Sequence, residues 1–339
     1  MVTSDTRNRP MRDLRISVTD RCNLRCRYCM PAERFGRDHR FLPDDAVLTD
    51  DEIVRLAGIF VGLGTHKLRI TGGEPLLRAG LPQLVARLTS RLPADGDLAL
   101  TTNGTLLQKL APRLRDAGLH RVTISLDALD PDIFSRLGGT SLEPKRVLAG
   151  INAALSAGLG VKINTVVKRD VNESQVVPLA KLAHDLHVPI RFIEFMDVGT
   201  TNGWNHHHVV PSAELIARLA EHFDLAKVHQ PDLSETARRY HHTEAPESAE
   251  VGFISSVSEP FCRDCTRARL SADGKFFTCL FASGGHDLRS LLRIGADDAA
   301  LTRTITGIWN ARGDRYSEQR AHATPGDRHD KPEMSYIGG

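Results

Sequence analysis

The stretch RISVTDRCNLRCRYCMP, residues 15–31, places three cysteines directly after a short apolar run that is typical of a buried strand. Cys22, Cys26 and Cys29 are spaced Cys-x3-Cys-x2-Cys. In barrels of alternating strands and helices, the segments that follow the strands form the rim that carries the active site. The stretch therefore predicts a functional site at the carboxyl end of a strand over residues 14–18.

Five more strand-like runs follow, and amphipathic helical patterns lie between them. The runs cover residues 67–71, 98–103, 121–126, 161–167 and 190–195. The helical patterns cover residues 51–62, 106–117, 145–157 and 173–186, with Asp50 as the expected N-cap of the first. Strands that alternate with helices predict βαβ units and a parallel sheet. Six units are two short of a closed eightfold barrel, so we expect an α/β fold with a partial (β/α)6 TIM-like barrel.

The pattern changes after residue 195, and two domains are expected. Residues 1–210 form the barrel in this interpretation, and residues 211–339 form a C-terminal α+β extension. Within the extension we expect a helix over 212–222, an irregular segment over 228–250, a β-rich run over 252–257 and a hairpin around 272–274. Helices are expected over 286–294 and 298–310, whereas the final RHDKPEMSYIGG is too polar for one.

Charge and hydropathy exclude several classes of protein. The 339 residues include 44 Lys and Arg and 42 Asp and Glu, a formal net charge of +2, which argues against a dedicated nucleic-acid or membrane-surface binder. No run approaches the ~18 apolar residues of a membrane-spanning helix. The start, MVTSDTRNRPMRDLR, lacks the apolar core of a secretory signal. We therefore expect a cytoplasmic protein.

The six cysteines form two groups of three, and the second group is Cys262, Cys265 and Cys279. An even number would allow disulfides, but clustered thiols in a chain without an export signal more often bind metal. Three thiolates can hold a 4Fe–4S cluster and leave one iron without a protein ligand. The alternative is zinc with a histidine as fourth ligand, for which His286 is the nearest candidate in the second group.

Two arginines follow the second Cys-x2-Cys pair. Arg267 and Arg269 alternate with Ala268, so in an extended strand both guanidiniums point to one face. Two guanidiniums beside a cluster with an open iron suit a polyanion such as a triphosphate. A solvated strand face is the alternative.

The first triplet, with Tyr28 before its last cysteine, resembles the signature of radical S-adenosylmethionine enzymes. The stretch TGGEP at residues 71–75 resembles the glycine-rich segment of the same superfamily. The resemblance implies that S-adenosylmethionine chelates the open iron and that electron transfer cleaves it to a 5′-deoxyadenosyl radical. Glycines permit close approach of backbone to ligand, and Glu74 is expected to accept bonds from the ligand's ammonium group.

The resemblance extends from about residue 12 to residue 339. The motifs RISVTDRCN, CMP, ITGGEP, TTNG, ISLDA, RFIEFMDVG, CTRARLS, DGKF, CLF and DRYSEQR, with the terminal Gly-Gly, resemble the molybdenum cofactor biosynthesis protein A family. This resemblance implies a lyase that is a GTP 3′,8-cyclase, in the first step of molybdenum cofactor (molybdopterin) biosynthesis. The adenosyl radical takes hydrogen from C3′ of GTP, and C3′ attacks C8 to give 3′,8-cyclo-7,8-dihydro-GTP. Two 4Fe–4S clusters and S-adenosylmethionine are the implied cofactors.

The same resemblance implies roles for individual residues. The metal ligands are Cys22, Cys26, Cys29, Cys262, Cys265 and Cys279. The S-adenosylmethionine contacts are Tyr28, Gly73, Ser125 and Met196, of which Ser125 and Met196 could equally be packing residues. The GTP contacts are Arg15, Arg69, Thr101, Lys162, Arg267, Ala268 and Arg269. The catalytic residues are Arg267, Arg269, Gly338 and Gly339, the last two in a tail that enters the active site.

Alternatives remain for several of these roles. Arg15, Arg69 and Lys162 lie in otherwise apolar strands, and a buried cation needs an anion, which is either a triphosphate or a structural salt bridge. The terminal Gly-Gly could also be a frayed end. A radical S-adenosylmethionine enzyme acting on a peptide or other metabolite is the alternative function, and a zinc-binding interaction module is a third.

The expected partners follow from the implied pathway. They are GTP as substrate, a downstream cyclic pyranopterin monophosphate synthase, an electron donor and a second copy of the chain in a homodimer. We expect neither nucleic acid nor membrane as a partner.

Overall fold

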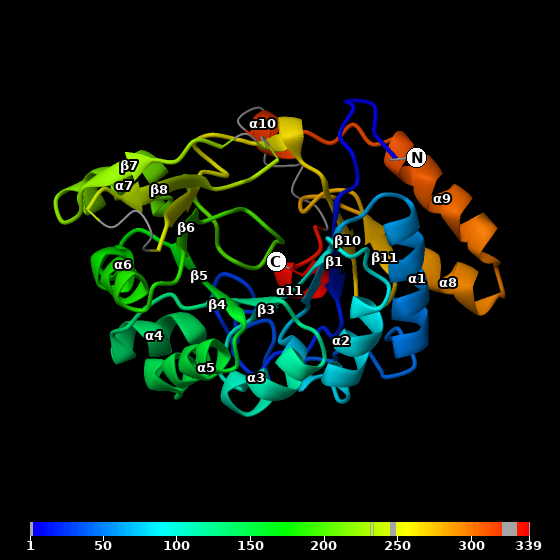
Figure 1. The fold of residues 1–339 in the computed structure, drawn as a ribbon, viewed down its shortest axis with the longest axis horizontal. Helices are drawn as coiled ribbons and strands as arrows, with labels where there is room; N and C mark the ends of the chain where they lie inside the picture. Colours follow the sequence, from blue (N-terminus) through cyan, green and yellow to red (C-terminus); the bar gives the residue numbers. More distant parts are fainter. Residues whose placement is uncertain (1–2, 231, 233, 245–248, 321–330, 339) are drawn as a thin grey trace.

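The computed structural model describes residues 3–230, 232, 234–244, 249–320 and 331–338. Its centre is an arc of six parallel strands that lie side by side in chain order (Figure 1). The strands are β1 Asp13–Ser17, β2 Lys67–Thr71, β3 Asp97–Thr102, β4 Arg121–Ser125, β5 Gly160–Val167 and β6 Ile190–Glu194. The six predicted strands and the partial barrel are confirmed.

Helices cover the convex face of this arc (Figure 1). They are α1 Asp50–Gly62, α2 Leu81–Thr89, α3 Leu107–Asp116, α4 Pro131–Gly138, α5 Pro144–Ser156 and α6 Val176–Asp185, with short 3-10 turns η1 Pro75–Leu77 and η2 Glu173–Gln175. The N-cap of α1 is Thr49 and not Asp50 as predicted. The Thr49 hydroxyl accepts from the Glu52 amide, and the Glu52 carboxylate accepts from the Thr49 amide. This reciprocal pair satisfies two free helix donors, so Asp50 becomes the first helical residue.

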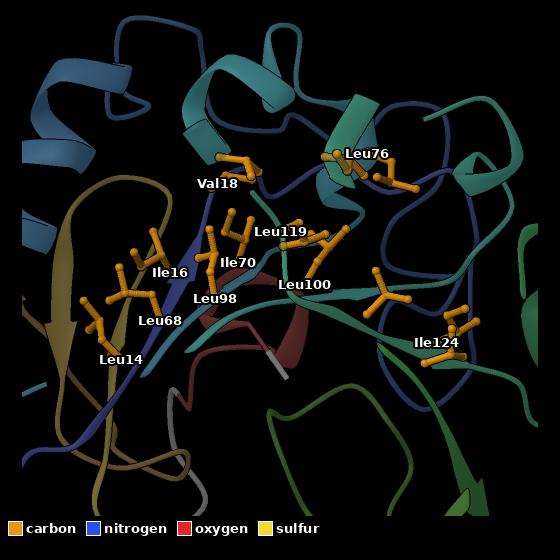
Figure 2. Packing of buried hydrophobic residues seen from close by; sticks show 14 of the residues in the cluster. Leu14, Ile16, Val18, Leu68, Ile70, Leu76, Leu98, Leu100, Leu119 and Ile124 are labelled. Atoms are coloured by element: carbon orange, nitrogen blue, oxygen red, sulfur yellow. The ribbon is translucent and has the colours of Figure 1, made fainter. Parts of the chain in front are cut away.

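The strands are apolar on one face and polar on the other. Alternate side chains of β1 to β4 lie between the sheet and the helices and are fully buried (Figure 2). On β1 and β2 these are Leu14, Ile16, Leu68 and Ile70. Because side chains of a strand alternate between faces, the intervening residues point into the hollow of the arc. The core is therefore outside the barrel wall, and the concave face is left for polar groups.

Two further parallel strands extend the arc at its opposite edges. Strand β9 (Val251–Ile254) pairs with β6, and strand β10 (Arg267–Leu270) pairs with β1. Eight consecutive strands are therefore parallel, although the two outermost come from the last third of the chain. Antiparallel strands complete the sheet on both sides: β8 Arg238–His242 and β7 Leu225–Lys227 beyond β9, and β11 Lys275–Phe277 and β12 His286–Asp287 beyond β10. The predicted domain division at residue 210 stays a prediction.

The remaining helical segments lie in the second half of the chain. They are η3 His206–His208, α7 Ser212–Ala220, η4 Cys262–Asp264, α8 Leu288–Arg293, α9 Asp298–Asn310, α10 Tyr316–Gln319 and α11 Met334–Ile337. None of the helices in the described ranges combines the length and apolar composition that a membrane span requires. The predicted hairpin is confirmed, because β10 and β11 are antiparallel neighbours around Gly274.

Three predictions for this half are wrong. The segment 228–250 contains β8, because Tyr240 packs on Phe253 of β9, a long-range contact that its polar sequence conceals. Residues 286–287 pair with β11, so the helix expected from residue 286 begins at Leu288. The polar C-terminal stretch forms α11, whose Ile337 is fully buried inside the arc.

Candidate active site inside the strand arc

One cavity on the concave face is lined by both cysteine triplets. Its lining includes Cys22, Cys26, Cys29, Cys262, Cys265 and Cys279. All six cysteines are free, and each residue as a whole is partly exposed. The empty space in and around the cavity, counting its open mouth, is about 1810 Å³. Both triplets therefore face one and the same space.

The first triplet lies in a tight loop that is held by backbone hydrogen bonds. The backbone amides of Cys29 and Met30 both donate to the carbonyl oxygen of Cys26, at 2.9 and 2.8 Å. Burial raises the pKa of the Cys22 thiol to about 11 and raises the pKa values of Cys26 and Cys29 as well. Since a metal binds the thiolate, a bound iron cluster supplies the positive charge that these buried sulfurs lack.

The four residues predicted to contact S-adenosylmethionine all line the cavity. They are Tyr28, Gly73, Ser125 and Met196. The Tyr28 hydroxyl donates to Asp127 at 2.6 Å, and burial raises the pKa of the Asp127 carboxyl to about 6. A Cβ at Gly73 would lie 2.3 Å from the carbonyl oxygen of Arg21, so glycine is required there by the adjoining cysteine loop.

Glu74 does not face the cavity, and the prediction that it accepts from a ligand's ammonium group is wrong. Its side chain is fully buried. One carboxylate oxygen accepts from the amide of Leu76 at 3.0 Å and the hydroxyl of Thr102 at 2.7 Å, and the other accepts from the amide of Asn103 at 2.7 Å. Burial raises the pKa of this carboxyl to about 7. Glu74 thus fastens the glycine-rich loop to the end of β3.

A band of cations crosses the cavity wall. The Cα of Arg15 is in register with Arg269 on one side and Arg69 on the other. Arg69 donates to the hydroxyls of Thr101 and Thr123 at 3.0 and 3.1 Å. Burial lowers the pKa of Arg69 to about 9 and also lowers the pKa of Arg15. The lowered pKa values mean that few nearby groups stabilise the positive charges of these arginines in this part of the cavity wall.

The band continues onto Arg191 of β6, whereas Lys162 of β5 is on the same face of the sheet but is not among the residues that line the cavity. Burial and the nearby Arg191 guanidinium lower the pKa of Lys162 to about 7. Arg191 lines the cavity and is in register with Asn164, whose buried Oδ1 has no partner among the described residues. The sequence analysis missed Arg191, although it lies in an apolar strand just as Arg15 does.

The structural salt bridges considered for these cations are not found in the described part of the chain. Within it, no carboxylate lies within 4.0 Å of the charged nitrogens of five of the cations, which are Arg15, Arg69, Lys162, Arg191 and Arg269. The Nε atoms of Arg15 and Arg69 are buried and lack any hydrogen-bond partner there. An anionic ligand would satisfy both nitrogens.

The second triplet is held by arginines from distant parts of the chain. Arg9 donates to the carbonyl of Cys262 and Arg312 to the carbonyl of Cys265, both at 2.7 Å. Asp5 pairs with both arginines, at 2.6 and 3.4 Å. No motif identified these three residues, because their partners are backbone atoms brought close only by folding.

Arg267 contacts the second triplet directly. Its Nη2 donates to the Cys265 sulfur at 3.1 Å. Burial alone would raise the pKa of the Cys265 thiol, but the Arg267 and Arg312 guanidiniums hold it at about 6. His286 is exposed in β12 and does not line the cavity, so the zinc alternative loses its expected fourth ligand.

Ala268 differs from its two neighbours. Its side chain is fully buried in the hydrophobic core, on the opposite face of β10 from Arg267 and Arg269. A contact from Ala268 to a ligand would therefore involve its backbone alone.

The C-terminal tail lies inside the arc beside β1 (Figure 1). The carbonyl oxygen of Gly338 accepts a hydrogen bond from Arg269, and Met334 lines the cavity. Glu333 accepts from the amide of Thr200 at 2.9 Å. Gly339, the last predicted tail residue, lies outside the described residues.

Comparisons with known proteins agree with this site. A model described as the radical SAM superfamily matches residues 16–183, and one described as Molybdenum Cofactor Synthesis C matches residues 188–318. A protein of Acidothermus cellulolyticus named GTP 3′,8-cyclase is 52% identical over 99% of this chain and 98% of its own length. The chain belongs to the GTP 3′,8-cyclase family. A second cyclase, from Staphylococcus haemolyticus, is 46% identical over the same shares of both chains.

Solved structures of other proteins share the fold of this cyclase-family chain. The structure of Streptococcus suis SuiB bound to S-adenosylmethionine superposes with a TM-score of 0.63 and covers 95% of this chain and 73% of its own. At 14% identity this likeness shows the fold alone. The partial barrel and the membership predicted from the motifs are both confirmed.

The cofactors of the cyclase family are iron–sulfur clusters and S-adenosylmethionine, and the residues present fit them. Each triplet offers three thiols to one cavity. The orphaned Nε atoms of two buried arginines lie in the wall of that same cavity. This donor set suits thiolate-held clusters and an anionic ligand together.

Proposed function

We propose that this chain converts GTP to 3′,8-cyclo-7,8-dihydro-GTP, the first step of molybdenum cofactor biosynthesis. The observation that carries the proposal is a group of cations, Arg15, Arg69, Arg191 and Arg269, which have no carboxylate partner among the described residues and line the same cavity as the two cysteine triplets. The cations match a triphosphate, and the two triplets match the two clusters of the cyclase family.

The cofactors, when bound, supply the one-electron chemistry that activates C3′ of the ribose. The work of the chain's own residues is to bind and orient. Arg15, Arg69 and Arg269 bind the triphosphate, since their guanidiniums form adjacent forks in register across three strands. Arg191 extends this binding along the wall, and Lys162 lies on the same face of the sheet.

The Tyr28 side chain orients the ligand of the first triplet. Its ring is held by the hydrogen bond to Asp127, which in turn accepts from the amide of Val166 at 2.9 Å. Ser125 and Met196 lie at the same rim of the cavity. Asp127 thus connects the cysteine loop, through Tyr28, to strand β5, through Val166.

The second triplet holds the base end of GTP in this proposal. Arg267 stands between the cation band and Cys265, so it contacts the substrate and the cluster ligand from one position. The tail closes the concave side, because Gly338 meets Arg269 and α11 lies against β1. Closure excludes water from the reacting atoms.

The test is an anaerobic incubation of reconstituted protein with S-adenosylmethionine, dithionite and GTP. We expect 5′-deoxyadenosine and a product isobaric with GTP in the mass spectrum, both dependent on GTP. The variant Arg69→Met removes one member of the band, and we expect it to form the product slowly. Deoxyadenosine without a GTP-derived product would favour the peptide or metabolite alternative instead.

Iron analysis tests the remaining alternative. About eight irons per chain agree with two clusters, whereas about two zincs would support an interaction module. The cytoplasmic localisation, the homodimer and the downstream synthase stay predictions.

A further inference from the structure

A basic surface borders the first cysteine triplet. Residues 21–40 contain six arginines and only two carboxylates, Glu33 and Asp38. This segment has a formal excess of four positive charges, whereas the whole chain has a net charge of +2. The remainder of the chain is therefore slightly acidic, and the positive charge is concentrated on the loop that carries the triplet.

Four of these arginines are exposed and uncommitted. They are Arg27, Arg34, Arg37 and Arg40, which we call the arginine surface. Over the described part of the chain none of the four guanidiniums has an ion pair or a hydrogen bond to the protein. Arg27 also lies close enough to Lys168 to contribute, after burial, to the lowered pKa of that lysine. Arg27 and Lys168 therefore hold two like charges near each other.

The other two arginines of the segment have structural tasks. Arg21 pairs with Asp44 at 3.2 Å. Arg25 donates to the carbonyls of Phe35 and Cys22, at 2.7 and 2.8 Å, and so closes the loop on itself. The contrast shows that the four outward arginines are not needed for the loop's own fold.

The loop under the arginine surface is rigidly supported. The amides of Arg25 and Arg27 donate to the carbonyls of Gly138 and Leu137, at 2.8 and 3.0 Å, at the end of α4. The ring of His39 lies 4.6 Å from the rings of both Phe35 and Phe41. A preorganised surface loses little entropy when a partner docks, which favours recognition by charge.

The arginine surface lies next to the cluster ligands along the chain. Arg27 directly follows Cys26, and adjacent Cα atoms are about 3.8 Å apart. The three cysteines lie in this same loop, so a carrier that docks on the arginine surface lies next to the ligands of the first cluster.

We propose that the arginine surface is the docking site of an acidic one-electron carrier protein. The proposal rests on the proposed function, which consumes an electron at the first triplet. The reduced carrier loses one electron and is oxidised, and the cluster held by Cys22, Cys26 and Cys29 gains it. No proton, bond or group moves in this step.

A protein partner fits the surface better than a nucleic acid or a lipid bilayer. Glu33 and Asp38 are exposed among the arginines and would repel a uniform array of phosphates. The basic character is also confined to one loop, whereas nucleic-acid binders extend it over a face or groove. Mixed charges with a positive excess instead complement a mixed acidic protein surface.

The probe is reduced flavodoxin, and the variant is Arg27→Glu/Arg34→Glu/Arg37→Glu. The matched control is Lys109→Glu/Arg113→Glu/Lys181→Glu, which reverses three exposed charges on α3 and α6. Stopped-flow absorbance follows cluster reduction, and fluorescence anisotropy of labelled flavodoxin gives the Kd. In the variant, we expect the rate of cluster reduction to fall and the Kd for flavodoxin to rise, each about 10-fold or more. Added salt should also slow reduction and weaken binding in the wild type. The control variant should not differ from the wild type.

Dithionite separates this proposal from the proposed function. We expect it to reduce the cluster of the variant and the wild type equally, because a small reductant needs no docking. Equal reduction of both by flavodoxin would overturn the docking site, whatever the enzyme's product. Anionic vesicles or duplex DNA that bind the wild type but not the variant, with flavodoxin binding unaffected, would also overturn it. Absence of a GTP-derived product with dithionite would instead overturn the proposed function and leave the Kd comparison valid.

Discussion

Arg269 on β10 donates a hydrogen bond to the carbonyl oxygen of Gly338, which lies 69 residues later in the chain. The bond joins a wall residue of the cation band to the tail that closes the cavity. Burial, reinforced by the neighbouring Arg15, lowers the pKa of Arg269 well below its usual range. The tail carbonyl is therefore a partner for a cation that the wall itself leaves uncompensated.

Replacing Arg269 by alanine should impair both functions of this guanidinium. We expect Arg269→Ala to lower kcat/KM for GTP about 100-fold, the usual scale for truncating a buried, hydrogen-bonded charge. Trypsin should also cleave the C-terminal segment faster than in the wild type. Unchanged proteolysis would contradict an anchoring role for the bond.

Gly338 has a backbone that favours glycine, with φ of 72° and no room for a side chain. A Cβ would lie 2.2 Å from Cγ2 of Thr71. We expect Gly338→Ala to slow product formation about 10-fold, through roughly 1–2 kcal/mol of left-handed strain together with the clash. The control is Gly307→Ala in α9, where a Cβ meets no atom of the described residues within 4 Å. Equal turnover of both variants would show that the tail position is immaterial.

Lys162 should take up a proton when GTP binds. Its pKa is lowered to about 7 by burial and by Arg191, so at pH 8 about nine-tenths of it is neutral. A bound triphosphate favours the ammonium form and raises this pKa. Calorimetry at pH 8 in buffers of different ionisation enthalpy should show uptake approaching one proton. Lys162→Met should abolish the uptake, and the exposed-site control Lys181→Met should keep it.

The lowered pKa of Lys162 also makes the free energy of unfolding depend on pH. Because the unfolded state binds the Lys162 proton between about pH 7 and 10.5 and the folded state does not, the free energy of unfolding rises with pH in that window. Urea titrations should show a smaller rise in Lys162→Met. An equal rise in both proteins would assign the pH dependence to other groups.

The two triplets should load independently. We expect the triple alanine variant of Cys22, Cys26 and Cys29 to keep about four irons per chain, and the variant of Cys262, Cys265 and Cys279 likewise. Either variant should lack product formation with GTP. Loss of all iron from one variant would mean that the two sites fold or load as a unit.

Asp197 should hold the start of the tail. It accepts from Arg320 at 2.8 Å and from Tyr316 at 2.5 Å, and Lys331 lies 3.7 Å away. Asp197→Ala leaves two buried cations without this anion, at a cost of about 3–5 kcal/mol in the free energy of unfolding. Asp298→Ala, which removes a surface partner of Arg55, should cost less than about 1 kcal/mol. Similar values for both variants in urea unfolding would contradict the difference in burial.

Strands β1 to β6 were predictable because their signal is local. In these strands apolar residues recur at about every second position, and the six strands lie in the sheet in chain order. Strand β8 was not predictable, because its sequence RRYHH has no alternation of apolar and polar residues and its pairing depends on β9. Helix α11 was missed for the same reason, since the arc buries it around Ile337.

The residues of the candidate site likewise divide into those with a local sequence signal and those whose role depends on long-range contacts. Cysteine spacing predicted both triplets, and the family resemblance, together with their isolation in apolar strands, predicted Arg15 and Arg69. Asp127 lies in the motif ISLDA, but no role was predicted for it, because that role depends on a hydrogen bond to Tyr28 across 99 positions of sequence. For Glu74 the motif predicted a contact with a ligand, and this prediction was wrong. In the folded chain its carboxylate oxygens accept hydrogen bonds from the backbone amides of Leu76 and Asn103.

The order of strands in the sheet has a consequence for synthesis on the ribosome. Strand β1 is among the first segments to emerge, yet its neighbour β10 is translated about 250 residues later, after roughly 13–50 s at usual elongation rates. During that interval the outer edge of β1 offers unpaired amide and carbonyl groups to other chains. The arc is therefore closed at this edge only near the end of translation, and nascent chains need shielding until then.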